Sequence, residues 1–251
     1  MPGLPIGSQS LMPEVMMSQF VVRAPETPSV PMVGSEARFP VHRIYCVGRN
    51  YADHAIEMGA SGREPPFFFM KPADAVLPVG AGGGEMAYPS LTTNLHHELE
   101  LVVAIGQGGR DIPVAQALDH VYGYAMGLDL TRRDLQDDMK QHRRPWCISK
   151  GFDQSAPLGP ITPAAQVPQV QQMAIRLDVN GTVRQSGSTD QMIWNVAEII
   201  AQASQAWALQ PGDLIFTGTP AGVGAVVPGD VLTVWSEGLT PFTLRIGARV
   251  A

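Results

Sequence analysis

Three acidic side chains in this sequence could share one metal ion. Glu98 and Glu100 stand two residues apart in an apolar run, HHELELVVAI, and Asp129 closes a second apolar run, VYGYAMGLDL. In an extended strand, side chains two residues apart point to the same face, so the two glutamates would lie side by side. Burying like charges together is costly unless a cation neutralises them. Three carboxylates, with no Cys or His at ligand spacing, suit Mg²⁺ or Mn²⁺ better than zinc.

A second interpretation of the glutamate pair needs no metal. An isolated pair of this kind commonly lines the wet face of an edge strand. Apolar side chains would then line the opposite face, namely those of Leu99, Leu101, Val103 and Ile105. The residues around the pair must decide between the two interpretations.

A possible general base stands upstream of the acids. His54 and Glu57 are three residues apart, which makes them neighbours on one helical turn. A carboxylate beside an imidazole orients it and raises its basicity, as activation of a water molecule requires. Taken alone, such a pair is more often a solvated surface pair.

Two further segments could contact a ligand. Lys150 lies in CISKGFD, where a partly desolvated amine could hold an anionic oxygen or form a Schiff base. Its alternative is a lysine whose ammonium reaches water. In FTGTPAGVG, Gly218 would let the backbone approach a ligand and the hydroxyls of Thr217 and Thr219 could bind it, unless the segment is an ordinary tight turn.

The elements that must position these residues are mostly strands. RIYCVG and FFFMK are strand patterns, and the glycine-rich residues 79–89 predict a loop without a phosphate-binding motif. Asn180-Gly181 in IRLDVNGTVRQ predicts a hairpin with a type I′ turn. A short helix is expected from Pro113, a polar helix or lid over residues 131–144, and one strong amphipathic helix over 190–209. We therefore expect a β-rich α+β fold with few, short helices.

Composition limits the function classes. Of 251 residues, 45% are hydrophobic and 16% charged, which indicates a folded protein. The net charge of −6 argues against a nucleic-acid partner. Two distant cysteines predict buried thiols in a reducing compartment, and no apolar run predicts a membrane span or a secretory signal, so we expect a cytoplasmic location. Residues 1–40 predict an extended arm with a short strand near 20–22, and residues 41–251 one main domain.

Several segments, in this order and spacing, resemble one enzyme family: GRNYADH, FFFMKP, HHELELVVAIG, GYAMGLDLTRRDLQ, PWCISKGFD and LIFTGTPAGVG. From Arg43 to the C-terminus the chain resembles the fumarylacetoacetate hydrolase family, in particular its acylpyruvases and the bacterial fumarylpyruvate hydrolases of gentisate catabolism. The resemblance implies a mixed β-sandwich or β-roll domain, an oxo-acid substrate, one Mg²⁺ or Mn²⁺ per subunit and a homodimer.

The resemblance also implies a role for each candidate residue. It implies the metal ligands Glu98, Glu100 and Asp129, the water-activating pair His54 and Glu57, the enolate-stabilising Lys150, and the substrate contacts Arg133, Gln136, Gly218 and Thr219. The expected reaction is hydrolysis of the carbon–carbon bond of an acylpyruvate, with fumarylpyruvate giving fumarate and pyruvate.

Fumarylpyruvate carries a carboxylate at each end, and a basic cluster could hold the distal one by bidentate pairing. This cluster comprises Arg132, Arg133, Lys140, Arg143 and Arg144. The alternative is a solvated helix, because Asp134, Asp137 and Asp138 balance these charges.

Three other functions stay open on the sequence. A family member could decarboxylate oxaloacetate or isomerise a longer dicarboxylate, which needs no attacking water. Lys150 could serve as a Schiff-base nucleophile in a metal-independent lyase. The acids could also form a structural cation site in a binding protein.

Overall fold

The computed structural model describes residues 20–51 and 63–249. Its centre is an eight-stranded mixed sheet in which β12 (Thr162–Pro163) joins β9 beside the main path. Along that path the strands are β4 (Phe67–Lys71), β3 (Ile44–Gly48), β15 (Leu214–Phe216), β8 (Leu99–Ile105), β9 (Val121–Leu128), β11 (Ala156–Leu158) and β5 (Val76–Pro78).

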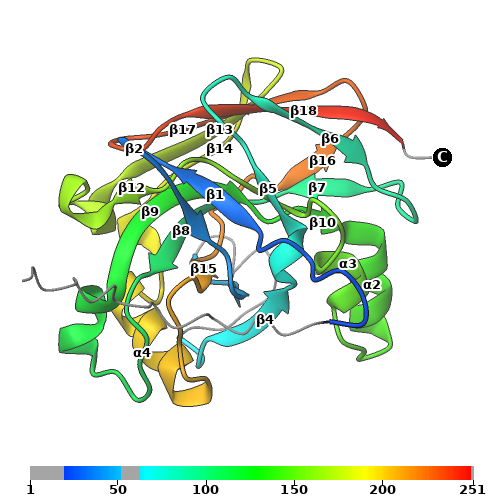
Figure 1. Ribbon diagram of the computed structural model, residues 1–251. Helices are drawn as coiled ribbons and strands as arrows, with labels where there is room; N and C mark the ends of the chain where they lie inside the picture. Colours follow the sequence, from blue (N-terminus) through cyan, green and yellow to red (C-terminus); the bar gives the residue numbers. More distant parts are fainter. Residues whose placement is uncertain (1–19, 52–62, 250–251) are drawn as a thin grey trace, which may run out of the picture.

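A five-stranded sheet lies across the top of the molecule in Figure 1. Its order is β14 (Thr182–Ser188), β13 (Ala174–Val179), β17 (Val231–Ser236), β18 (Phe242–Arg249) and β6 (Gly84–Tyr88). Leu101 and Val103 of β8 share one buried apolar cluster with Ile175 and Leu177 of β13, so the main core lies between the two sheets. The β-rich mixed fold with few short helices is confirmed.

Strand β6 corrects one expectation. Residues 84–88 lie inside the glycine-rich segment predicted as a loop, yet they pair in parallel with β18. The pairing joins segments far apart in the chain, and its hydrogen bonds outweigh the poor strand propensity of the local sequence.

Strand β8 lies inside its sheet and is buried on both faces. β15 and β9 flank it, and all seven of its residues are buried. The face that carries Val102 and Ala104 packs in a second cluster with Val30 and Phe39 of the hairpin formed by β1 (Ser29–Met32) and β2 (Ser35–Pro40). The interpretation of a solvated edge strand for Glu98 and Glu100 is therefore wrong. The strand expected near residues 20–22 is also absent, and these two strands of the arm begin later.

Hairpin and helix predictions hold in part. Asn180 (φ 52°) and Gly181 (φ 77°) form the two-residue turn between β13 and β14. The amphipathic helix is shorter than predicted: α4 (Val196–Ala206) starts after Asn195, whose side chain accepts from Glu198 N in a capping box. The segment after Pro113 forms a 3₁₀ helix, Val114–His120, rather than an α-helix.

The remaining elements surround the acids. A three-stranded sheet combines β10 (Thr131–Arg132), β7 (Leu95–His97) and β16 (Gly224–Val226). Two helices, α2 (Arg133–Gln141) and α3 (Cys147–Lys150), lie side by side at the right of Figure 1. The Cys46 thiol is buried as expected, whereas Cys147 at the start of α3 is exposed. In the described ranges, no helix has the length and apolar character that a bilayer span requires.

Candidate active site

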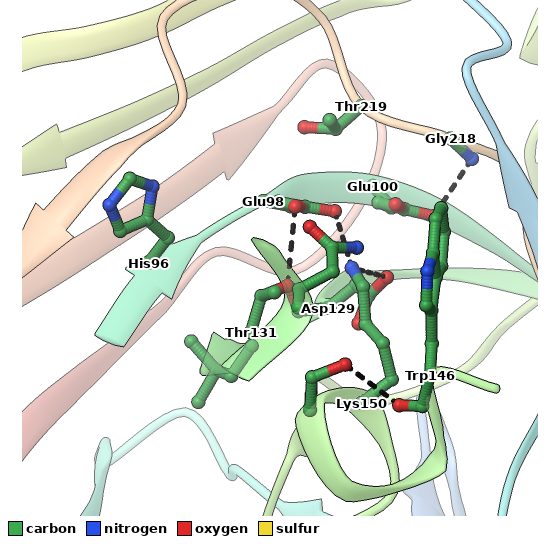
Figure 2. Close-up of polar contacts among 12 residues, drawn as sticks. His96, Glu98, Glu100, Asp129, Thr131, Trp146, Lys150, Gly218 and Thr219 are labelled. Carbon is green, nitrogen blue, oxygen red and sulfur yellow. Dashed lines mark hydrogen bonds and ion pairs between the residues drawn. The ribbon is translucent and has the colours of Figure 1, made fainter. Parts of the chain in front are cut away.

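The structure brings the three predicted acids together (Figure 2). Glu98 connects β7 to β8, Glu100 lies in β8, and Asp129 follows β9. The pairing of Glu100 with Gly127 and the 2.9 Å hydrogen bond from Asp129 N to Glu98 O align the two strand ends. One carboxylate oxygen of each acid lies within 4.8 Å of the others, and all three residues are buried.

Lys150 lies between two of these acids. Its Nζ donates to Glu98 Oε2 at 2.8 Å and to Asp129 Oδ2 at 2.7 Å, and the residue is only 2% exposed. Burial alone would lower the pKa of Lys150, but Asp129 and Glu98 outweigh burial and raise it. The interpretation of a lysine that reaches water is therefore wrong, and the buried ammonium can face an anionic oxygen in the site.

A second buried lysine, Lys71, was not identified from the sequence. Its Nζ lies 2.8 Å from Asp129 Oδ1, and it donates to the carbonyl oxygens of Leu130, at 3.2 Å, and of Lys150. It thus joins the end of β4 to the segment after β9 and to α3. The signal that could have identified it is a lysine that ends an aromatic strand, FFFMK, directly before a proline.

Glu100 differs from the other two acids in its partners. Gly218 N donates to Glu100 Oε2 at 2.8 Å, but Glu100 forms no ion pair with any described residue. Burial, followed by the charges of Asp129 and Glu98, raises its pKa well above the usual value. A hard divalent cation would remove this cost, and an all-carboxylate donor set fits Mg²⁺ or Mn²⁺. The three acids therefore fit the predicted metal.

The expected substrate contacts lie beside the acids. Arg133 at the start of α2 forms an ion pair with Glu98 and a hydrogen bond to Gln136. Thr219 Oγ1 accepts from Gln185 Nε2 at 2.8 Å and lies on the same pocket as these residues. Gly218 has a φ of 100°, and a Cβ there would lie 2.7 Å from Asn50 Cβ, so the position requires glycine. Their roles toward a substrate stay predictions, and His54 and Glu57 lie outside the described residues.

The predicted basic cluster is divided by the fold. The guanidinium carbon of Arg132 lies 4.4 Å from the centroid of the Phe152 ring. Arg132 lines a separate cavity of about 660 Å³, and none of the three acids lines that cavity. Arg143 and Arg144 are exposed, and Lys140 pairs with Asp137 at 3.5 Å. Of the five basic residues, Arg133 alone lines the described pocket over the acids. The five cannot hold one carboxylate together.

The pocket over the acids has other walls that the sequence did not reveal. Aromatic side chains form one side: Trp146 contacts Phe67 at 5.4 Å and Phe69 at 5.8 Å between ring centroids. Arg49, at the end of β3, also lines it. The free space in this pocket is small, about 30 Å³.

Comparison with known proteins assigns this architecture to a family. Residues 43–247 match the family model described as fumarylacetoacetate (FAA) hydrolase C-terminal. The oxaloacetate tautomerase FAHD1, mitochondrial, of Homo sapiens is 42% identical over 203 residues, which cover 81% of this chain and 90% of the relative. An oxaloacetate decarboxylase, mitochondrial, of Dictyostelium discoideum is 42% identical over 197 residues, covering 78% of this chain and 89% of the relative.

A solved structure is more similar still. The crystal structure of fumarylpyruvate hydrolase from Pseudomonas aeruginosa, in complex with Mn²⁺ and pyruvate, matches with a TM-score of 0.90 and 53% identity. The match covers 92% of this chain and all of that one.

Proposed function

This chain belongs to the fumarylacetoacetate hydrolase family, and from that premise we propose that it is a metal-dependent hydrolase that cleaves the carbon–carbon bond of an acylpyruvate. Fumarylpyruvate is the proposed substrate, with fumarate and pyruvate as products. The observation that carries the proposal is the set of three buried carboxylates with a buried ammonium between two of them. The similarity to a fumarylpyruvate hydrolase bound to Mn²⁺ and pyruvate supports the choice of substrate.

Glu98, Glu100 and Asp129 would hold the divalent cation, Mg²⁺ or Mn²⁺. When bound, such an ion polarises the oxygens of a 2-oxo acid as a Lewis acid. The chain itself contributes the fixed charges around it. Lys71 and Lys150 hold Asp129 from two sides, so its carboxylate is oriented before any ligand arrives.

Hydrolysis requires water at the distal carbonyl and a place for the electron pair of the broken bond. We propose that His54, oriented by Glu57, takes a proton from water as the water oxygen bonds to that carbonyl carbon. The carbon–carbon bond then breaks and its electron pair moves onto the pyruvate fragment as an enolate. The ammonium group of Lys150, which lies between Glu98 and Asp129, would stabilise the enolate oxygen. The proton that His54 took from water then passes to the carbon of this fragment and completes pyruvate.

Lys150 is poorly suited to the Schiff-base alternative. A lysine nucleophile must be neutral, as in a desolvated site without acids nearby. Here Glu98 and Asp129 both contact the ammonium and raise its pKa. We therefore assign Lys150 to charge stabilisation. Borohydride trapping with pyruvate should give no covalent adduct.

An assay with EDTA-treated protein tests the proposed function. Fumarylpyruvate is added with and without Mg²⁺ or Mn²⁺, and the diketo absorbance, pyruvate and fumarate are measured. We expect metal-dependent loss of absorbance with one pyruvate and one fumarate released per substrate. Metal-independent turnover, or none, would contradict the proposal.

A second function is favoured by the curated relatives. Proteins 42% identical to this chain are named as an oxaloacetate tautomerase and an oxaloacetate decarboxylase. Both reactions would use the same acids and Lys150 but no attacking water. The replacement His54→Ala separates the two functions, because hydrolysis should be lost whereas oxaloacetate turnover should be largely retained.

A further inference from the structure

We propose that Arg49 recognises the distal carboxylate of the substrate and thereby selects acylpyruvates that carry a second acid group. The inference rests on the proposed function and names the substrate class that this site prefers. In this role Arg49 takes the place of the basic cluster within residues 131–144, because only Arg133 of that cluster lines the described pocket over the acids.

Arg49 lines the pocket over the acids and is the basic residue there that no acid among the described residues neutralises. The pocket also contains Arg133 and Lys150, but Arg133 pairs with Glu98, and Lys150 with Glu98 and Asp129. The Arg49 side chain forms no ion pair or hydrogen bond with another described residue, and its buried Nε has no partner among them. Its contact is the face of the Phe67 ring, 5.9 Å from the guanidinium carbon to the centroid. A buried donor without a partner is costly, so a ligand oxygen at this position is favoured.

The backbone at Arg49 is held in a conformation that aims the side chain. Its φ is 57°, a strained conformation that a residue with a side chain seldom adopts. Asn50 maintains it, because its side-chain amide donates to Thr217 O at 2.7 Å and to Trp194 O at 2.9 Å, and accepts from Trp194 N at 2.8 Å. On the other side, Gly48 packs against the Phe67 ring so closely that a Cβ would overlap it. The strain is therefore stored at one arginine beside the acids.

The surroundings of Arg49 favour an anion. Burial lowers the pKa of Lys140, and the charges of Arg133 and Arg49 lower it further. Both arginines therefore lie near enough to repel the Lys140 ammonium, although Asp137 opposes them, and an added carboxylate would relieve this repulsion. Glu98, Glu100 and Asp129 line the same pocket as Arg49, and with a bound cation they would face the other end of an oxo acid, so a substrate with two acid ends matches this lining.

Two substrates that differ in the distal group provide the test. Fumarylpyruvate carries the second carboxylate and acetylpyruvate does not. Arg49→Met removes the guanidinium at similar length and leaves no hydrogen bond among described residues broken. We expect kcat/KM for fumarylpyruvate to fall about 10- to 100-fold, as for the loss of a charged hydrogen bond, and kcat/KM for acetylpyruvate to change less than about threefold. Arg49→Lys should be intermediate, because it keeps the charge but loses the planar fork.

Arg144→Met is the matched control, since it removes an exposed arginine of the former cluster and should leave the ratio of the two substrates unchanged. Equal losses for both substrates in Arg49→Met would overturn the inference. The inference would also be overturned if Arg144→Met lowered the ratio of kcat/KM for fumarylpyruvate to kcat/KM for acetylpyruvate as far as Arg49→Met does.

A binding measurement separates this inference from the proposed reaction. Calorimetry with Mn²⁺-loaded protein compares 2-oxoadipate with 2-oxohexanoate, which differ in one terminal carboxylate. We expect the wild type to bind the diacid at least tenfold more tightly and Arg49→Met to lose that preference. If the protein does not turn over fumarylpyruvate but still prefers the diacid, and this preference depends on Arg49, the proposed hydrolase reaction is rejected and the inference about Arg49 stands. Absent preference in the wild type would reject the inference whatever the reaction.

Discussion

Lys150 and Lys71 are both buried beside Asp129, yet their ammonium groups face different partners. Lys150 contacts carboxylate oxygens of Glu98 and Asp129, whereas Lys71 contacts Asp129 and two backbone carbonyls. Lys150 thus lies where a reacting oxygen can meet it, and Lys71 ties three segments of chain together. Their replacements should have different effects.

Lys150→Met should reduce turnover much more than metal binding. Without the ammonium, negative charge that develops on the substrate loses its stabilising donor, and kcat should fall about 100- to 1000-fold. Steady-state assays at saturating Mn²⁺ measure this, and calorimetry should show that Mn²⁺ still binds. A kcat within tenfold of the wild type would remove Lys150 from the chemistry.

Lys71→Met should instead reduce stability. The change leaves Asp129 Oδ1 and the carbonyl oxygens of Leu130 and Lys150 buried without their ammonium partner. Breaking a buried ion pair from one side costs about 3–5 kcal/mol, which urea unfolding of the metal-free protein would measure. Lys140→Met is the control variant, and we expect it to lower the free energy of unfolding by about 0.5 kcal/mol or less. A free energy of unfolding of Lys71→Met within about 1 kcal/mol of the wild type, roughly the spread of surface substitutions, would contradict this role.

At the scale of elements, α2 is anchored through its first turn. Asp134 accepts from Thr92 Oγ1 at 2.6 Å and from Thr93 N at 2.9 Å, which fixes the start of the helix to the segment before β7. Arg133, the residue before it, is thereby held beside Glu98. Burial opposes ionisation of Asp134, but these hydrogen bonds outweigh burial and lower its pKa below the usual 3.8.

Asp134→Asn should destabilise the protein in a pH-dependent way. A carboxyl whose pKa is lower in the folded state contributes stability above its unfolded pKa and loses it as pH falls through the folded pKa. We expect a loss of about 1–2 kcal/mol at pH 7, from the charged hydrogen bonds, that shrinks below about pH 4. Urea unfolding at several pH values measures it. A difference between the proteins that is constant with pH would exclude an ionised Asp134 as the cause.

At the scale of the whole molecule, the site lies where strands of the eight-stranded sheet end against α2, α3 and the small three-stranded sheet (Figure 1). Three like charges are buried there, and Glu100 forms no ion pair with the described part of the chain. Metal binding should therefore be linked to global stability.

Saturating Mn²⁺ should raise the midpoint of thermal unfolding. A ligand at a concentration of 100 times its Kd adds about 2.7 kcal/mol to the free energy of unfolding. For a chain of this size, that raises the midpoint of thermal unfolding by roughly 5–10 °C. Glu100→Gln should abolish most of this shift. The metal-free variant should be at least as stable as the wild type, since a buried charge is removed while an amide oxygen can still accept from Gly218 N. An equal Mn²⁺ shift in both proteins would exclude Glu100 as a ligand.

Local features of the sequence determined what depends on near neighbours. The spacing of Glu98 and Glu100 predicted side chains on one face, and Asn180-Gly181 predicted its turn, because strand periodicity and turn dihedrals are set within a few residues. The apolar face of the α4 helix was predicted for the same reason, although its start at Val196 depended on the Asn195 cap. The motif resemblance, rather than any one residue, indicated the family.

Tertiary structure alone decided which side chains share the site. That β8 is central, and not an edge, depends on its pairing with β15 and β9, which come from elsewhere in the chain. The ammonium of Lys71 reaches Asp129, and Arg132 turns away to Phe152 although its neighbour Arg133 reaches Glu98. No local pattern encodes these contacts, because burial and ion pairing depend on segments that meet only when the sheets close over one another.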